Sequence, residues 1–353
     1  MFIKIGSALL AGLVLFGALV WFADLGGIKT RIFVNQIVKM RVSPERLTNI
    51  KTPSDYGMPF SDVDIMTPDG VRLSAWEIPA PTASDKTIIM NHALSTTRYG
   101  SVEGLDGVPV EYLPMVKHLH DAGYNVVMYD HRGQGDSDGG TGETQIGTEA
   151  PVGVGATEWQ DVIGSLQYVK SHPRFSDHQI AFVSHCMGAS ATFRAWSEAP
   201  QTFSDPQIKS VVAIQPPIAY RMNKRFIIAK AKMDIVDDVL AAQIAKYGFG
   251  FADNVQHAKN LTVPVLFSQV EADEYTFDVD TGVNDVQLIY DAAPTEKEII
   301  WVRATGDKPH GTGKRFDGYG YFNKYPDELL SFLGKHFMSE SIVSSEAAPD
   351  SDQ

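Results

Sequence analysis

Short apolar runs alternate with amphipathic stretches along the chain from residue 61 onward. Apolar runs between turn residues predict strands, and apolar positions three and four apart predict helices. The predicted strands are residues 61–67, 71–78, 86–91, 125–130, 179–183, 209–214, 263–267 and 297–302, and the predicted helices are 111–122, 158–171, 188–198, 283–292 and 324–337. This order is typical of an α/β fold with a mostly parallel, doubly wound sheet, and the opening hairpin adds antiparallel strands at one edge.

One connection in this series is much longer than a crossover needs. About fifty residues separate the strand that ends at Ile214 from the strand that begins at Val263, and they read as two amphipathic helices. The segment leaves the end of the sheet where ligands bind in such folds. We therefore predict a helical lid insertion over about 216–260, with additional packing as the alternative interpretation.

The first residues follow a different pattern. Residues 5–23, "IGSALLAGLVLFGALVWFA", form an uncharged apolar run of about the length that crosses a bilayer. A cleaved signal peptide is the alternative, but Trp21 stands two positions before Ala23, where a cleavage site needs a small residue. The run predicts an N-terminal transmembrane helix within a membrane anchor over residues 1–24.

The anchor prediction sets the remaining boundaries. Residues 25–60 become a basic juxtamembrane linker, 61–338 the α/β domain, and the acidic end 339–353 a disordered tail. Lysine and arginine are in excess on the C-terminal side of the apolar run, where the chain has Lys29, Arg31, Lys39 and Arg41. This excess weakly favours a single-pass protein whose folded domain lies on the cytoplasmic face.

Composition removes several function classes. The formal net charge of -13 argues against nucleic acid as a partner. A single cysteine excludes an internal disulfide, so the fold must be stabilised by its core. The glycine-rich stretches lack the strand-turn-helix context of nucleotide motifs, and no metal-ligand spacing stands out. We therefore expect neither a cofactor nor a metal.

That cysteine lies in "SHCMG", residues 184–188, between an apolar strand and a helix. A nucleophile elbow needs small residues two positions before and two after the nucleophile, and Ser184 and Gly188 meet this requirement around Cys186. Ser184 itself is excluded as the nucleophile, because Phe182 would then occupy a position that needs a small residue. The helix N-terminus favours a thiolate. We predict that Cys186 is a nucleophile; an inert buried cysteine is the alternative.

Two long segments carry a family resemblance. "HDAGYNVVMYDHRGQGDSDGG" (120–140) and "DVIGSLQYVKSHPRFSDHQIAFVSHCMGAS" (161–190) resemble the α/β-hydrolase superfamily, and the match extends over roughly 63–337. The resemblance implies the α/β-hydrolase fold. Cysteine at the elbow is similar to dienelactone hydrolases and polyhydroxyalkanoate synthases, although Ser184 stands where those families usually have glycine.

The resemblance also implies a catalytic triad in the order nucleophile, acid, histidine. Asp273 matches the acid, with Glu271 as the alternative acid, and His310 matches the base. The backbone N–H groups of Leu94 and Met187 match the oxyanion hole.

The implied function is a membrane-anchored hydrolase that cleaves an ester, thioester or lactone through a Cys-His-Asp triad and a thioester acyl-enzyme. Two alternatives are an acyltransferase that uses the same acyl-enzyme and a non-catalytic binding protein built on the hydrolase fold. The predicted partner is a small, lipophilic acyl substrate.

Overall fold

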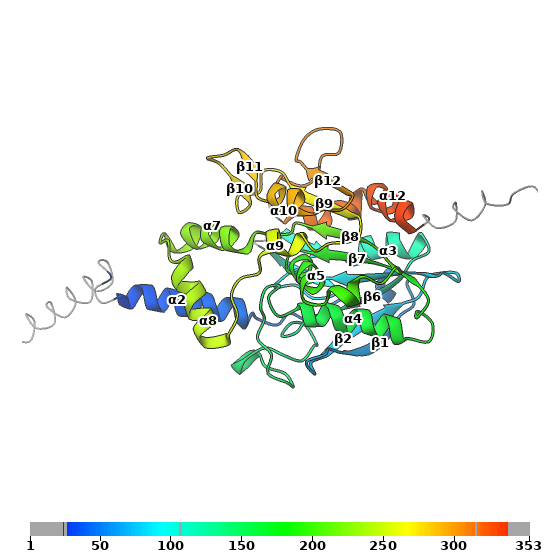
Figure 1. Ribbon diagram of the computed structural model, residues 1–353, viewed down its shortest axis with the longest axis horizontal. Coiled ribbons are helices and arrows are strands. Elements are labelled where there is room, and N and C mark those ends of the chain that lie inside the picture. The colour runs from blue at the N-terminus through cyan, green and yellow to red at the C-terminus, as the bar shows by residue number, and fades with distance from the viewer. Residues whose placement is uncertain (1–23, 25–26, 106–107, 315, 338–353) are drawn as a thin grey trace, which may run out of the picture.

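A computed structural model describes residue 24 and residues 27–105, 108–314 and 316–337 of the 353-residue chain. Its centre is an eight-stranded sheet in the order β1-β2-β6-β3-β7-β8-β9-β12 (Figure 1). The strands are β1 (Ser61–Met66), β2 (Arg72–Ile78), β3 (Lys86–Asn91), β6 (Asn125–Tyr129), β7 (Gln179–His185), β8 (Ile208–Ile214), β9 (Val265–Val270) and β12 (Lys297–Val302). β1 and β2 pair antiparallel at one edge, and the strands from β6 to β12 pair parallel. The predicted α/β sheet is therefore confirmed.

Helices cover both faces of this sheet. The helices α4 (Trp159–Ser171), α5 (Met187–Glu198) and α10 (Val286–Ala292) pack on one face, and α3 (Leu113–Asp121) and α12 (Pro326–Phe337) on the other. Successive residues of a strand point to opposite faces, so Ile88 contributes to one core cluster and Ile89 to the other. This two-sided burial explains why the central strands read as continuous apolar runs.

Several smaller elements connect these layers. They are two hairpins, β4 (Gly100–Leu105) with β5 (Val108–Glu111) and β10 (Phe277–Asp278) with β11 (Val283–Asn284), the short helices α6 (Pro200–Phe203), α9 (Asn254–Ala258) and α11 (Tyr321–Lys324), and the 3-10 turns η2 (Pro53–Tyr56), η3 (Gly142–Thr144) and η4 (Asp317–Gly320). The start of the predicted helix over 283–292 is instead strand β11.

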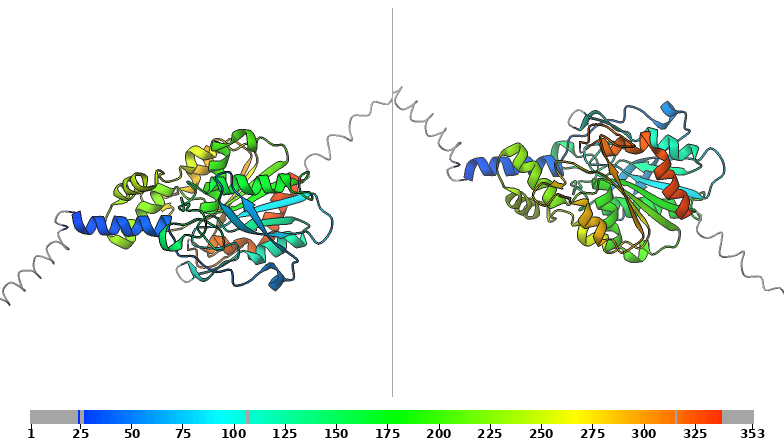
Figure 2. Two further views of the ribbon diagram at one scale, coloured as in Figure 1. Left: turned by 90° about the horizontal axis from the view of Figure 1, so that it is seen from below. Right: turned by 90° about the horizontal axis from the view of Figure 1, so that it is seen from above.

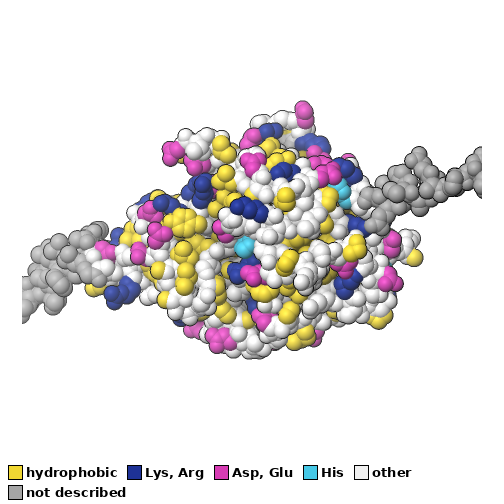
Figure 3. Space-filling model, viewed as in Figure 1, with side chains coloured by type: hydrophobic (Ala, Val, Ile, Leu, Met, Phe, Trp, Pro, Cys, Tyr) yellow, Lys and Arg dark blue, Asp and Glu magenta, His cyan; other side chains and the backbone are white. Residues whose placement is uncertain are grey.

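The long insertion forms two helices, α7 (Ala219–Ala231) and α8 (Val236–Tyr247). They pack against α2 (Ile28–Val42) at one end of the molecule, and both views in Figure 2 show α2 running alongside them. The shared cluster contains Val34, Val38 and Val42 of α2 together with Ile227, Ile235, Val236 and Val239. Apolar side chains also gather on the outer surface at this end of the molecule (Figure 3).

The predicted membrane anchor must be corrected. Residues 5–23 lie outside the part of the chain that the structure describes, and within that part no helix has the length and apolar character that a membrane span requires. Much of the predicted juxtamembrane linker is the 15-residue helix α2, which carries four basic residues and packs on the lid. The described part of the chain therefore gives no support to the single-pass anchor or to the membrane localisation derived from it. The predicted tail, 339–353, also lies outside the described residues.

Candidate active site

Cys186 lies at the sharp turn between β7 and α5 with φ 46° and ψ -103°. A non-glycine residue with this backbone is strained, and such strain is typical of the nucleophile elbow. Its N–H donates to the carbonyl of Ile214 at 2.8 Å, which ties the turn to the neighbouring strand β8. The side chain is half-buried and lines a cavity of about 280 Å³.

The residues on either side of Cys186 explain how the turn fits against β3. A Cβ at position 188 would lie 2.6 Å from Asn91 Cβ and 2.7 Å from the Asn91 carbonyl oxygen, so Gly188 permits this contact. Ser184 is buried, and its hydroxyl accepts a hydrogen bond from Asn91 Nδ2 and pairs with Thr192 Oγ1, each at 2.8 Å. A serine is accommodated there because both polar neighbours satisfy its hydroxyl.

Replacing Gly188 with alanine is expected to lower the free energy of unfolding by about 1–3 kcal/mol, because the added Cβ overpacks against backbone that has little freedom to move. Urea denaturation followed by circular dichroism measures the change. Gly334→Ala is the matched control, because a Cβ there meets nothing within 4 Å. Equal stability of the two variants would contradict the close contact with β3.

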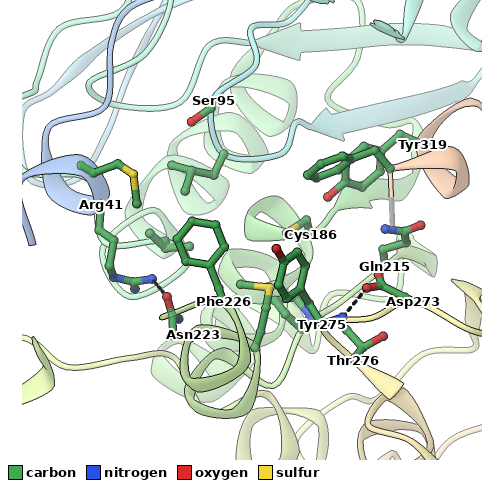
Figure 4. A pocket seen from close by; sticks show the side chains of 16 residues that line it. Arg41, Ser95, Cys186, Gln215, Asn223, Phe226, Asp273, Tyr275, Thr276 and Tyr319 are labelled. Atoms are coloured by element: carbon green, nitrogen blue, oxygen red, sulfur yellow. Dashed lines mark hydrogen bonds between the residues drawn. The ribbon is translucent and has the colours of Figure 1, made fainter. Parts of the chain in front are cut away.

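The cavity beside Cys186 is mostly apolar and draws on distant parts of the chain (Figure 4). The lid helix α7 contributes Met222, Asn223 and Phe226, and α2 contributes Met40 and Arg41. Its other lining residues come from loops and from η4, namely Leu94, Ser95, Val154, Gln215, Pro217, Asp273, Tyr275, Thr276, Phe316 and Tyr319. The helices α2 and α7 thus supply part of the lining of this cavity.

The two residues predicted for the oxyanion hole lie close together. Leu94 lines the cavity and packs in a small cluster with Met187, whose N–H hydrogen-bonds the Cys186 sulfur. The Gln134 side chain holds both segments: its Oε1 accepts the Ser95 N–H at 2.8 Å and its Nε2 approaches Met187 Sδ at 3.7 Å. Ser95 has φ 57°, so this loop also turns sharply before the cavity.

Asp273 follows β9 and lines the same cavity. It is 2% exposed, and its Oδ1 accepts the Tyr275 N–H at 2.8 Å. Burial raises the pKa of this carboxyl to about 7. The structure therefore brings Cys186 and Asp273 to one cavity.

Glu271, the alternative acid, lies elsewhere. Its carboxylate forms a bidentate ion pair with Arg303 at 2.6 and 2.7 Å on the surface, and this pairing lowers its pKa. It does not line the cavity. Its placement favours Asp273 over Glu271 as the acid.

His310 is not brought to the cavity. It follows β12, and its N–H donates to the carbonyl of Arg303 at 2.8 Å. Its ring lies against Tyr321, with ring centroids 5.6 Å apart, and partial burial lowers the pKa of the imidazole. The preceding carbonyl of Pro309 accepts from the Tyr325 hydroxyl at 2.8 Å, which further ties the loop to this position.

Tyr319 contacts the thiol instead, and the sequence analysis missed it. It lies in η4, is buried, and its hydroxyl hydrogen-bonds Cys186. The Asp317 carboxylate holds this turn by accepting the N–H groups of Thr312 and Lys314 at 2.7 and 2.9 Å. No motif in "DGYG" distinguishes such a tyrosine from one in the core.

The charge state of Cys186 differs from the thiolate expected at a helix N-terminus. Burial is the largest influence and raises the pKa of the thiol, and the nearby charge of Asp273 raises it further. The hydrogen bonds from Tyr319 and the Met187 N–H lower the pKa, but their effect is weaker than that of burial. The neutral thiol is therefore the resting form at neutral pH, and a base must act during attack.

The raised pKa of Asp273 predicts a pH-dependent gain in stability for Asp273→Asn. Between the ordinary carboxyl pKa of 3.8 and about 7, the unfolded chain releases this proton while the folded chain keeps it, so folding becomes less favourable as pH rises. The full penalty, about 4 kcal/mol by the linkage relation, is present above pH 7. Asp273→Asn should therefore raise the free energy of unfolding at pH 8 and have little effect near pH 4.

Urea denaturation at both pH values measures this gain. Glu271→Gln is the control, because its ion pair shifts the carboxyl pKa in the opposite direction and the variant should gain nothing at pH 8. An Asp273→Asn effect that is the same at pH 4 and pH 8 would contradict the raised pKa.

Within the described residues, no three His, Cys, Asp or Glu side chains are grouped as metal ligands.

Comparisons with known proteins agree with this fold. Residues 102–245 match the family model described as serine aminopeptidase, S33. An esterase of Pyrococcus furiosus has a similar structure, with a TM-score of 0.58 and 23% identity over 85% of this chain and 97% of its own. The α/β hydrolase GrgF of Penicillium has a TM-score of 0.51 and 18% identity, over 79% of this chain and 99% of its own. Acylaminoacyl peptidase of Pyrococcus horikoshii has a TM-score of 0.53 and 14% identity, over 84% of this chain and 43% of its own. No curated protein matches the chain significantly.

Proposed function

The chain has the α/β-hydrolase fold, and from this premise we propose that it is a hydrolase of carboxylic esters whose nucleophile is Cys186. The observation that carries the proposal is the strained turn at Cys186, which presents the only cysteine of the chain to a mostly apolar cavity. The apolar lining favours a substrate with an apolar acyl chain.

The reaction follows from the groups at the cavity. The sulfur of Cys186 attacks the ester carbonyl carbon, a C–S bond forms, and the carbonyl electrons move to the oxygen. The N–H groups of Leu94 and Met187 donate to this oxyanion. Its collapse breaks the bond to the alcohol, which leaves with a proton, and water then hydrolyses the thioester. Thioesters and lactones present the same carbonyl and belong to the same proposal.

The thiol proton needs an acceptor. In the arrangement described, Asp273 is the titratable carboxyl at the cavity, and its pKa of about 7 suits a base that acts just above neutral pH. His310 serves as the base only if the loop between Arg303 and Phe316 moves it to the cavity. We propose Asp273 as the acceptor in this arrangement, and His310 as the base of the rearranged one.

Intact-mass measurement of Cys186 acylation tests the function. Brief incubation with 4-nitrophenyl butyrate at pH 8 and an acid quench should give a mass increase of one acyl group, absent from Cys186→Ala. No adduct and no turnover with esters, thioesters or lactones would rule out the nucleophile. Faster release of the acyl group by an added alcohol or thiol than by water would favour an acyltransferase.

A non-catalytic binding protein is the second candidate. It is favoured by the raised pKa of the thiol and by the histidine-free lining of the cavity in the described part of the chain. The same experiment separates the two candidates, because a binding protein holds an ester in the cavity without acylation of Cys186.

A further inference from the structure

Arg41 is a buried cation at the cavity that contains Cys186. It lies near the C-terminal end of α2, is 4% exposed, and lines the cavity. Figure 4 shows its side chain reaching toward Asn223, on the opposite side of the view from Tyr319 and Asp273. The cation thus lies away from the groups proposed to act on the carbonyl.

The partners of Arg41 are neutral. Its guanidinium donates to the side-chain oxygens of Asn223 and Gln243, at 3.2 Å for Gln243, and lies over the ring of Phe251 at 4.4 Å from its centre. Its Nη2 is buried without a hydrogen-bond partner. No carboxylate in the described part of the chain forms an ion pair with it.

The acidic group that acts on Arg41 through space does not neutralise it by contact. Glu158 exerts this electrostatic influence, but its carboxylate oxygens accept the N–H groups of Gly153 and Gly155 at 2.7 and 2.6 Å. Burial lowers the pKa of Arg41 to about 10, so the group stays protonated at neutral pH. An unpaired cation in a mostly apolar cavity is unfavourable unless an anion joins it.

We propose that Arg41 binds a carboxylate at the far end of the substrate's acyl chain, so that the preferred esters are half-esters of short dicarboxylic acids. This inference rests on the proposed function for the position of the ester. One guanidinium in an apolar lining suits a monoanion, whereas a phosphate dianion needs more donors than this side of the cavity offers. The cavity volume of about 280 Å³ suits a short chain.

Binding of two matched amides tests the subsite without requiring turnover. The anilide of glutaric acid keeps one free carboxylate, and the anilide of pentanoic acid replaces it with a methyl group. Calorimetric titration of Cys186→Ala protein should show the carboxylate compound binding roughly 10- to 100-fold more tightly, the range for a charge-assisted hydrogen bond. Arg41→Gln in this background should lose that preference.

Two further variants keep the test decisive. Arg31→Gln, on the exposed part of the same helix, should retain the preference. Asn223→Asp should abolish it with Arg41 in place, because the new carboxylate pairs with the guanidinium. Asn223→Asp also answers the question if Arg41→Gln fails to fold.

Three outcomes would overturn the subsite: equal binding of the two amides, a preference that survives Arg41→Gln or Asn223→Asp, or tighter binding of the matching phosphonate. A carboxylate preference in protein that cleaves no ester would refute the proposed function and leave the subsite standing. Ester cleavage by protein that shows no carboxylate preference would support the proposed function and refute the subsite.

Discussion

Cys186→Ala is expected to lower kcat/KM for an activated ester by roughly 10⁴-fold or more while the fold persists, because removal of a nucleophile leaves only binding and the oxyanion donors. Alanine loses the hydrogen bonds that Tyr319 and the Met187 N–H make to the sulfur, so the thermal midpoint should fall by a few degrees while the protein stays folded. Release of 4-nitrophenol, measured beside circular dichroism, gives both quantities.

Ser184→Ala is the matched control within the same elbow. Its hydroxyl is buried against Asn91 and Thr192 and does not line the cavity, so turnover should persist although stability falls. Loss of turnover in folded Ser184→Ala together with full activity in Cys186→Ala would move the nucleophile two residues along the strand.

The second large effect concerns the proton acceptor. In the arrangement described, Asp273→Asn should lower kcat/KM on the order of 10³- to 10⁴-fold, because the amide cannot take the thiol proton. His310→Ala should stay within a few-fold of wild type, because this imidazole packs against Tyr321 away from the cavity. Glu271→Gln, which only breaks a surface ion pair, is the control. The three rates are compared at pH 8.

A loss in His310→Ala as large as that in Asp273→Asn would show that the loop brings the histidine to the thiol during turnover. The pH profile then separates the roles. If Asp273 accepts the proton, activity in wild type should rise with pH through about 7, and this rise should disappear in Asp273→Asn. A rise that survives in Asp273→Asn but not in His310→Ala would contradict Asp273 as the base.

The parts of the site that could be predicted are those that steric requirements fix. A strand that turns directly into a helix tolerates few residues around its tip, so the segment around Cys186 identified the elbow. The resemblance implied Asp273 as the acid, and the structure places it just after β9, at the edge of the sheet where the cavity lies.

The positions of His310 and Tyr319 relative to the thiol could not be predicted, because they depend on how long loops fold. His310 lies within a connection that begins at Arg303 and ends at Phe316, and chain order does not determine which way a residue in such a loop points. Tyr319 lies beside the thiol because Asp317 fixes the turn that carries it, and the sequence offers no signal for this turn.

The helix α2 was assigned to a linker although a signal for packing was present. Val34, Val38 and Val42 are four residues apart and form one apolar stripe, which is typical of a helix that packs on a partner. The four basic residues of this helix led instead to the prediction of a juxtamembrane linker.

Helix α2 lines the cavity, and thereby affects which substrates fit, but it supplies none of the groups proposed to act on the carbonyl. The elbow and the helix α7 fall within residues 102–245, which match the family model, whereas α2 precedes that segment and still supplies Met40 and Arg41. Variants of this chain that keep the residues from Leu94 onward but differ in α2 should therefore keep the reaction and accept other substrates. Substitutions at the positions of α2 that line the cavity can therefore vary the substrate range without altering the reacting groups.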